Sequence, residues 1–196
     1  MQVVEIFDSI QGEGYWMGTY CTFVRLAGCN LKCSFCDEAK KYGKAKEMTI
    51  EQIVKECKQP IVIITGGEPT IQAQLPELID ALHKANHSVH IETNGSGNCR
   101  FLGGMMPDWV TVSPKKDNDF AICTNPTELK FVVDEALEWT TIEQIYEDWP
   151  TTPIWLQPCD GPWLEESKKK IIKWVGQSNI PCVRAGIQLH KWYEVV

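Results

Sequence analysis

Three cysteines that lie close together in the sequence are the residues with the clearest capacity for chemistry. They occur as Cys29-Asn-Leu-Lys-Cys33-Ser-Phe-Cys36, so a single stretch of eight residues carries all three thiols. Thiolates are soft ligands that select zinc, copper(I) or iron–sulfur clusters. Three thiols on one short loop can therefore close on one metal centre.

The number of cysteines in this loop distinguishes the kinds of metal centre. Structural zinc takes four ligands, usually from two paired hooks, and no second Cys-x-x-Cys hook occurs in the sequence. A zinc loop that takes Cys21 or Cys57 as its fourth ligand is the alternative. Most iron–sulfur clusters have four Cys ligands, and three leave one iron open to a small molecule. We interpret the loop as the holder of a [4Fe–4S] cluster with an open iron.

Other short segments combine glycine or proline with polar residues. In Gly66-Gly67-Glu68-Pro69, adjacent glycines allow close approach of the backbone to a ligand, and a carboxylate can accept hydrogen bonds from an ammonium group. Asn94-Gly95 and Ser113-Pro114-Lys115 are similar, and Lys115 could pair with a carboxylate. Each segment also suits an ordinary turn, and most lone lysines face solvent.

The strands that position these residues are predicted from apolar, β-branched runs. Eight runs qualify, namely Val3–Ile6, Thr22–Leu26, Ile61–Thr65, Ser88–Glu92, Trp109–Val112, Leu129–Val133, Ile154–Gln157 and Val183–Leu189. They are nearly continuous in apolar residues, as strands buried on both faces should be.

Four helices are expected between these strands. Thr49 and Gln52 form a capping box at the start of the first helix, and Thr140 with Glu143 is expected to open the third. The fourth is expected from Trp163 to Gln177. The second helix is indicated by an apolar stripe, made of Leu75, Leu78, Ile79 and Leu82.

Strands that alternate with helices are typical of a parallel sheet with crossover helices. A full eight-fold barrel needs about 200 to 250 residues, more than this chain offers with its loops. We predict an α/β fold, an incomplete β/α barrel with a mostly parallel sheet of about six strands. An open doubly wound sheet is the second choice. One domain over residues 1–196 is expected, with the cluster loop at 29–36.

In both folds the ligand binds at the carboxyl ends of the strands. The cysteine loop, the Gly66–Pro69 turn and the Ser113–Lys115 turn each follow a predicted strand, and so do Thr93 and Gln157. We therefore expect these segments to meet around one shared site.

The composition excludes several classes of function. The formal net charge of −7 argues against a nucleic-acid partner, because duplex binding depends on Lys and Arg that neutralise phosphates. No apolar stretch approaches the ~20 residues of a membrane helix, and no secretory signal is present. The nine cysteines are odd in number and irregularly spaced, unlike a disulfide framework. We expect a cytoplasmic protein with neither a nucleic-acid nor a membrane partner.

The cysteine spacing resembles the CxxxCxxC motif of the radical S-adenosylmethionine (SAM) superfamily. The segment Phe7-Asp-Ser-Ile-Gln-Gly-Glu-Gly14 resembles the FxSxQGEG segment of the 7-carboxy-7-deazaguanine synthases. The likeness continues through other segments, namely Phe23–Cys29, Thr65–Pro69, Ile91–Gly95, Val112–Lys115, Leu156–Pro158 and His190-Lys191. It therefore spans most of the chain.

The resemblance implies a reaction and its cofactors. The substrate would be 6-carboxy-5,6,7,8-tetrahydropterin, and the cofactors a [4Fe–4S] cluster, SAM and Mg²⁺. Cleavage of SAM would give a 5′-deoxyadenosyl radical that removes the hydrogen at C6. Ring contraction and loss of ammonia would then give 7-carboxy-7-deazaguanine, a precursor of queuosine and other deazapurines. An electron donor such as a flavodoxin and a homodimer are also implied.

The family's residue roles transfer to matching positions of this sequence. The cluster ligands are Cys29, Cys33 and Cys36. The implied cofactor contacts are Phe35, Asp37, Gly67, Glu68, Gly95, Ser113, Pro114, Lys115 and Gln157. The implied substrate contacts are Ile10, Gln11, Gly12, Arg25, Thr93 and the carboxylate of Val196.

One position departs from the family pattern. The family usually has Thr or Ser directly after the Cys-Asp pair, where the hydroxyl helps to hold Mg²⁺, and this chain has Glu38. A carboxylate is a hard oxygen ligand that also suits Mg²⁺. Our hypothesis is that Glu38 binds the metal directly.

Two other functions are weighed against this one. An activase of a glycyl-radical enzyme would share the cysteines and the cofactor turn, but its N-terminal segment would differ. The other alternative is a non-catalytic iron–sulfur carrier or zinc-binding module, although a carrier would usually ligate all its irons with Cys. Formation of 5′-deoxyadenosine separates the two enzymes from the module.

Overall fold

The computed structural model describes residues 1–36, 43–97, 106–122 and 125–195. Its strands are β1 (Gln2–Ile10), β2 (Tyr20–Leu26), β3 (Lys46–Glu47), β4 (Ile61–Gly66), β5 (Ser88–Thr93), β6 (Trp109–Val112), β7 (Glu128–Val133), β8 (Ile154–Pro158) and β9 (Val183–Ala185). Its helices are α1 (Ile50–Glu56), α2 (Leu75–Lys84), α3 (Trp139–Asp148), α4 (Leu164–Gln177) and α5 (Leu189–Trp192), with short 3₁₀ turns at Pro69–Ile71 and Lys116–Asn118.

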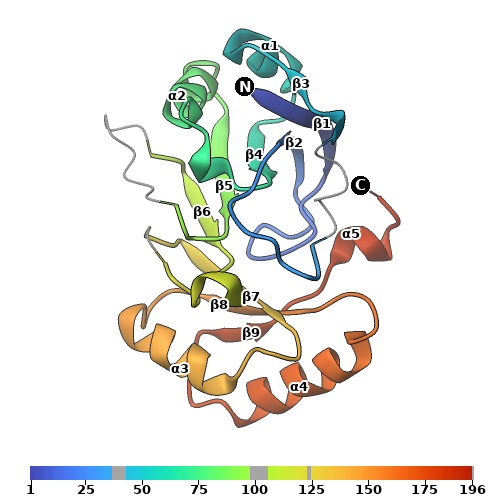
Figure 1. The fold of residues 1–196 in the computed structure, drawn as a ribbon, viewed down its shortest axis with the longest axis vertical. Coiled ribbons are helices and arrows are strands. Elements are labelled where there is room, and N and C mark those ends of the chain that lie inside the picture. Colours follow the sequence, from blue (N-terminus) through green and yellow to red (C-terminus); the bar gives the residue numbers. More distant parts are fainter. Residues whose placement is uncertain (37–42, 98–105, 123–124, 196) are drawn as a thin grey trace.

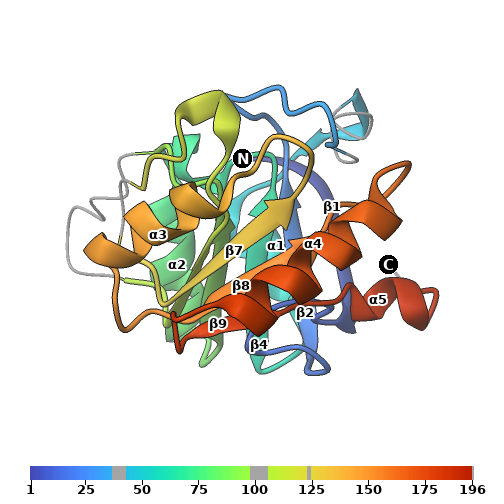
Figure 2. The same ribbon diagram turned by 90° about the horizontal axis from the view of Figure 1, so that it is seen from below.

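All nine described strands form one sheet in the order β3-β1-β2-β4-β5-β6-β7-β8-β9. The strands from β2 to β9 along this order run parallel, whereas β1 and β3 extend the β2 edge in antiparallel pairings. Within the described ranges β9 pairs with β8 alone, so the sheet stays open. Figures 1 and 2 show the strands curving with helices α1 to α4 on the outer side. The predicted incomplete barrel with a mostly parallel sheet is confirmed, but the sheet has nine described strands rather than about six.

Two apolar clusters hold the helices against the outer face of the sheet. The first joins β2, β4 and β5 to α1 and α2 through residues such as Val24, Ile64 and Leu78. The second joins β6 to β9 to α3 and α4 through residues such as Phe131 and Ile171. Because alternate residues of a strand point to opposite faces, the residues between these core positions face the inside of the barrel.

The helix ends show where local sequence decides and where packing does. At α1 the predicted capping box is confirmed: Thr49 N–H donates to Gln52 Oε1 (2.8 Å) and Gln52 N–H donates to Thr49 Oγ1 (3.3 Å). The box predicted at Thr140 is wrong, because α3 already begins at Trp139. The Trp139 ring packs against Trp174 of α4, 5.7 Å between centroids, so a tertiary contact outweighs the local cap.

Two predicted strands differ from the structure. The first runs on to Ile10 and lies antiparallel to β2, because the connection from residue 11 to residue 19 is too short for a parallel crossover. The last predicted strand, Val183–Leu189, ends at Ala185. Gly186 N–H donates to Leu156 O (2.9 Å) and Leu189 N–H donates to Gly12 O (2.8 Å). The first bond keeps Gly186 against β8 just beyond the end of β9, and the second joins the start of α5 to the loop after β1.

No helix in the described part of the chain has both the length and the apolar character needed to cross a bilayer.

Candidate active site

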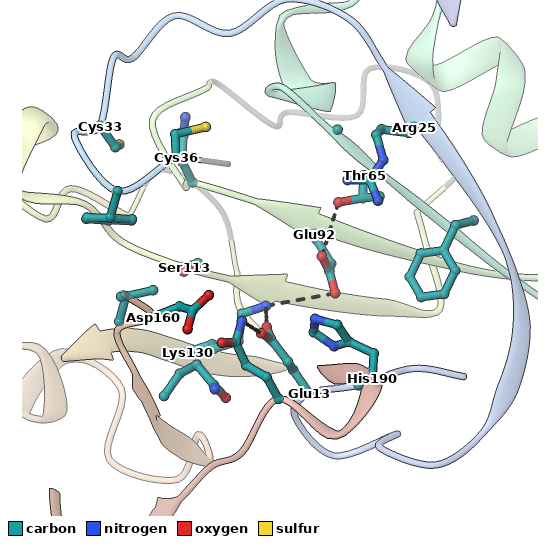
Figure 3. Close-up of a pocket in the computed structure, with 18 of the residues that line it drawn as sticks. Glu13, Arg25, Cys33, Cys36, Thr65, Glu92, Ser113, Lys130, Asp160 and His190 are labelled. Atoms are coloured by element: carbon teal, nitrogen blue, oxygen red, sulfur yellow. Dashed lines mark hydrogen bonds and ion pairs between the residues drawn. The ribbon is translucent and has the colours of Figure 1, made fainter. Parts of the chain in front are cut away.

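A cavity of about 520 Å³ opens at the carboxyl edge of the sheet (Figure 3). Thirteen of the predicted site residues line it, namely Ile10, Gln11, Gly12, Arg25, Cys29, Cys33, Phe35, Cys36, Gly67, Thr93, Ser113, Lys115 and Gln157. Parallel strands bring their carboxyl ends to one edge, which is why turns distant in sequence meet here. Asp37, Glu38 and Val196 lie outside the described residues.

The three thiols of the cluster loop all face this cavity and none is in a disulfide. Cys29 Sγ accepts a hydrogen bond from Leu31 N–H (3.4 Å), and Asn94 Nδ2 lies 3.9 Å from it. Burial raises the pKa of the Cys33 thiol to about 11. Donors directed at sulfur fit a loop that holds thiolates on a metal centre, since such hydrogen bonds stabilise and tune the cluster sulfurs.

The described residues contain no set of three Cys, His, Asp or Glu side chains close enough to share a single metal ion, and this includes the three loop cysteines. The three loop cysteines all line the cavity, so an iron left open in a cluster that they hold would be accessible to a small molecule there.

Glu68 lies behind the cavity wall and does not line the cavity, although it was predicted to contact the cofactor. Its side chain is fully buried. Its Oε1 accepts hydrogen bonds from Thr70 N–H (3.0 Å), Thr70 Oγ1 (2.5 Å) and Thr93 Oγ1 (2.6 Å), and its Oε2 accepts one from Asn94 N–H (2.6 Å). The carboxylate thus ties the turn after β4 to the turn after β5.

Gly95 and Pro114 also stand beside the cavity without lining it. Gly95 N–H donates to Thr93 Oγ1 (3.1 Å) and its φ of 80° is left-handed. Gly95 shapes its turn through this bond, and the neighbouring side chains of Thr93, Ser113 and Lys115 line the cavity.

Lys115 is turned inward rather than toward solvent. Its Nζ donates to Ser113 O (2.7 Å) and to Ser113 Oγ (2.5 Å). Burial lowers the pKa of this lysine to about 8, and nearby Lys130 lowers it further, against the opposing effect of Cys33 and acidic groups. The Lys115 ammonium group therefore lines the same cavity as the cysteine loop.

Arg25 is held rigidly at the other side of the cavity, away from Cys33 in Figure 3. Its Nε forms an ion pair with Glu5 Oε1 (2.8 Å), and its guanidinium lies over the Phe7 ring, 5.3 Å from the centroid. Phe7 in turn stacks on Phe23. A guanidinium fixed in this way is suited to binding a carboxylate.

The loop from Gln11 to Gly14 enters the barrel and forms part of the cavity floor. A Cβ on Gly12 would collide with the His190 ring, so any other residue there would force this side chain of α5 to move. The flanking residues meet strand residues: Gln11 Nε2 donates to Glu92 Oε1 (2.9 Å), and Glu13 binds Lys130.

The structure also brings together lining residues that were not predicted as site residues. They are Glu13, Thr65, Glu92, Lys130, Asp160, Gln188, His190, Lys191 and Val195, among others. For β7 a signal was present, because Glu128 and Lys130 alternate with Leu129 and Phe131. Polar residues at every second position of a buried strand indicate a polar interior.

Comparisons with known proteins show the family to which the chain belongs. The family model described as the radical SAM superfamily matches residues 23–141. The 7-carboxy-7-deazaguanine synthase of Bacteroides thetaiotaomicron is 45% identical over 161 residues, which cover 81% of each chain. The enzyme of the same name from Synechocystis is 32% identical, over 98% of this chain and 92% of the relative. The chain belongs to the 7-carboxy-7-deazaguanine synthase family of radical SAM enzymes.

The fold comparison supports the same family. The crystal structure of QueE from Escherichia coli matches with a TM-score of 0.71 at 28% identity, covering 96% of this chain and 94% of that one. The SAM-bound SuiB of Streptococcus suis, at 14% identity and a TM-score of 0.51, shares the fold. Membership in the radical SAM superfamily brings a [4Fe–4S] cluster and SAM as cofactors and a small-molecule substrate.

Proposed function

We propose that this protein is a 7-carboxy-7-deazaguanine synthase, which converts 6-carboxy-5,6,7,8-tetrahydropterin into 7-carboxy-7-deazaguanine and ammonia. The observation that carries the proposal is that one cavity collects the cluster loop, the Gly66-Gly67 turn, Lys115 and Arg25. A radical enzyme needs its cluster, its cofactor and its substrate side by side, and this cavity has residues suited to all three.

The residues divide into two groups around the cavity. Cys29, Cys33 and Cys36 would hold the cluster. When bound, the cluster and SAM supply the radical that starts the reaction. The side chains near the cluster loop that would hold and orient SAM are Phe35, Ser113, Lys115 and Gln157, together with the backbone of Gly67. The Lys115 ammonium suits the carboxylate of a bound amino acid moiety.

On the substrate side, Arg25 would bind the carboxylate of the pterin, with its plane fixed by Glu5 and Phe7. Ile10, Gln11, Gly12 and Thr93 would complete the pocket. Glu68 and Gly95 would act as positioning residues, because their contacts hold the turns and not the ligand, and Pro114 would contact the cofactor beside Ser113 and Lys115.

The test is anaerobic reconstitution with iron and sulfide, followed by SAM, a reductant, Mg²⁺ and 6-carboxytetrahydropterin. We expect 7-carboxy-7-deazaguanine by mass spectrometry, and none from a Cys33→Ala variant, because a cluster without this ligand is lost or displaced. Formation of 5′-deoxyadenosine without the deazaguanine would contradict the substrate and favour the activase. Neither product from a protein with an intact cluster would favour the non-catalytic module.

For the metal, we propose that Glu38 binds Mg²⁺ beside the substrate in place of the family's hydroxyl. The support is chemical, since Mg²⁺ prefers hard oxygen ligands and often uses one or two carboxylates. A Glu38→Ala variant should need a higher Mg²⁺ concentration for half-maximal turnover than the unaltered protein. An unchanged magnesium titration would refute a role of this side chain in metal binding.

Family resemblance is the support for three further features of the proposal: a homodimer, reduction by a donor such as a flavodoxin, and a cytoplasmic location. Sedimentation of the purified protein, cluster reduction by flavodoxin and cell fractionation check them in turn. We also propose that residues 1–196 act as a single domain.

A further inference from the structure

Three charged side chains lie together on the cavity floor, and none of them has a role in the function proposed above. We call them the charged triad. Glu13 comes from the loop after β1, Glu92 from β5 and Lys130 from β7 (Figure 3). Their side chains are 14%, 24% and 10% exposed, and all three line the cavity. Buried charges are costly unless they are paired, so their presence at a ligand-accessible surface calls for an explanation.

The two carboxylates of the charged triad lie at different distances from Lys130. Lys130 Nζ binds Glu13 Oε2 at 2.5 Å but lies 3.9 Å from Glu92 Oε1. The second distance is an ion pair without a hydrogen bond. An ammonium group has three protons, and Glu13 takes one of them. Lys130 therefore retains donor capacity beside Glu92.

Glu92 likewise retains acceptor capacity. Its Oε1 accepts a hydrogen bond from Gln11 Nε2 (2.9 Å) and its Oε2 accepts one from Thr65 Oγ1 (3.1 Å). A carboxylate has about four acceptor sites, so these two contacts hold the group in place and leave room for a ligand. The partners come from a loop and from a strand, which fixes the carboxylate from two sides.

The floor has an excess of negative charge. Glu128, two residues before Lys130 on β7, accepts hydrogen bonds from Thr111 Oγ1 (2.7 Å) and Tyr15 N–H (2.9 Å), and its charge also favours the ammonium form of Lys130. Burial disfavours the charged form of Lys130, but Glu13 and Glu92 outweigh it and raise its pKa. Burial likewise opposes ionisation of Glu13, and Lys130 outweighs it and lowers its pKa. Lys130 and Glu13 thus stay charged at neutral pH.

A ligand that fits this floor offers two adjacent hydrogen-bond donors with an acceptor next to them. The 2-amino-4-oxopyrimidine edge of a pterin has this pattern, with the 2-amino group and N3–H as donors and O4 as acceptor. We propose that Glu92 accepts from the two donors and Lys130 donates to O4, while Glu13 and Gln11 hold this pair in position. The inference rests on the proposed function. It adds which part of the substrate Glu13, Glu92 and Lys130 recognise.

The position of Arg25 supports this orientation. Figure 3 shows Glu92 between Arg25 and Lys130 in the cavity. In a 6-carboxypterin the carboxylate and the aminopyrimidinone edge lie at opposite ends of the bicyclic ring. A substrate whose carboxylate is bound by Arg25 would therefore direct its aminopyrimidinone edge away from Arg25 and toward the floor.

The experiment compares two ligands that differ at one position. Reconstituted protein with SAM and an unreduced cluster is titrated with 6-carboxypterin, which has a 2-amino group, and with 6-carboxylumazine, which has a 2-oxo group. We expect the unaltered protein to bind the pterin about 10- to 100-fold more tightly, as for a hydrogen bond to a charged group. Glu92→Gln should weaken pterin binding by about that factor and leave lumazine binding nearly unchanged.

Two lysine variants test the other half of the pair. Lys130→Met should weaken the binding of both ligands to a similar extent, because both carry O4. Lys130→Arg should bind both ligands more tightly than Lys130→Met does. If Glu92→Gln does not fold, as judged by circular dichroism, Glu92→Asp takes its place and should show a smaller preference than the unaltered protein. A purely structural ion pair would lower thermal stability in these variants without altering the preference.

The outcomes separate the inference from the proposed function. An unchanged pterin preference in a folded Glu92 variant overturns the inference alone, provided that the unaltered protein still makes the deazaguanine. Failure of the unaltered protein to bind 6-carboxypterin, while it still cleaves SAM to 5′-deoxyadenosine on reduction, overturns both the substrate and the inference.

Discussion

Glu68→Gln is expected to lower the stability of the apoprotein by about 3 kcal/mol, the cost of leaving buried donors and acceptors mismatched. The carboxylate is fully buried and accepts from Thr70, Thr93 and Asn94. A glutamine can place its oxygen on one side alone, so its NH₂ group faces donors on the other. For a chain of this size the change corresponds to a fall in Tm of about 6–12 °C.

The same substitution is expected to raise the KM for SAM, because the turns after β4 and β5 lose the group that joins them. Thermal unfolding followed by circular dichroism and SAM cleavage at varied SAM concentration measure the two effects. Glu143→Gln is the matched control, since Glu143 is exposed on α3 and a surface change should stay within about 0.5 kcal/mol. Equal Tm values for the two variants would refute the structural role given to Glu68.

Gly67→Ala is expected to disrupt the cluster loop itself. A Cβ at this position would collide with the carbonyl group of Gly28, directly before Cys29. The two turns are also joined by Gly67 N–H to Leu26 O (2.9 Å) and Glu68 N–H to Gly28 O (2.8 Å). Because the obstacle is backbone and not the end of a flexible side chain, relief requires the loop to move. We expect a loss of about 2–4 kcal/mol.

The measurements are the free energy of unfolding and the iron bound after reconstitution, and both should fall. Gly176→Ala is the control for this pair, because Gly176 lies within α4 with open space around its Cα. Because Gly176 is the second-last residue of α4, alanine there should change stability by no more than about 0.5 kcal/mol. Normal iron content and stability in Gly67→Ala would show that the two turns do not depend on this close approach.

Local sequence was sufficient to predict the elements that depend on interactions between residues close together in the chain. The capping box at Thr49 and the apolar stripe of α2 formed as predicted, because both depend on residues three or four positions apart. The alternation of buried strands and helices was also sufficient for the partial barrel, and hence for the edge where the cysteine loop, Lys115 and Gln157 meet. The start of α3 and the end of β9 were not predictable in this way, since Trp174 and Gly12 decide them from distant positions.

For the site, the residue types of the cysteine loop by themselves indicated a centre with soft metal ions, since thiolates select zinc, copper(I) or iron–sulfur clusters. The sequence motifs likewise indicated turns with residues that line the cavity. Only the tertiary structure decided that Glu68 is buried beside the cavity, where it joins two turns. It also decided that Glu13, Glu92 and Lys130 lie together in the cavity. The physical reason is that the partners of a carboxylate cannot be read from the residues next to it in the sequence. Its burial, hydrogen bonds and ion pairs depend on strands that the fold brings together.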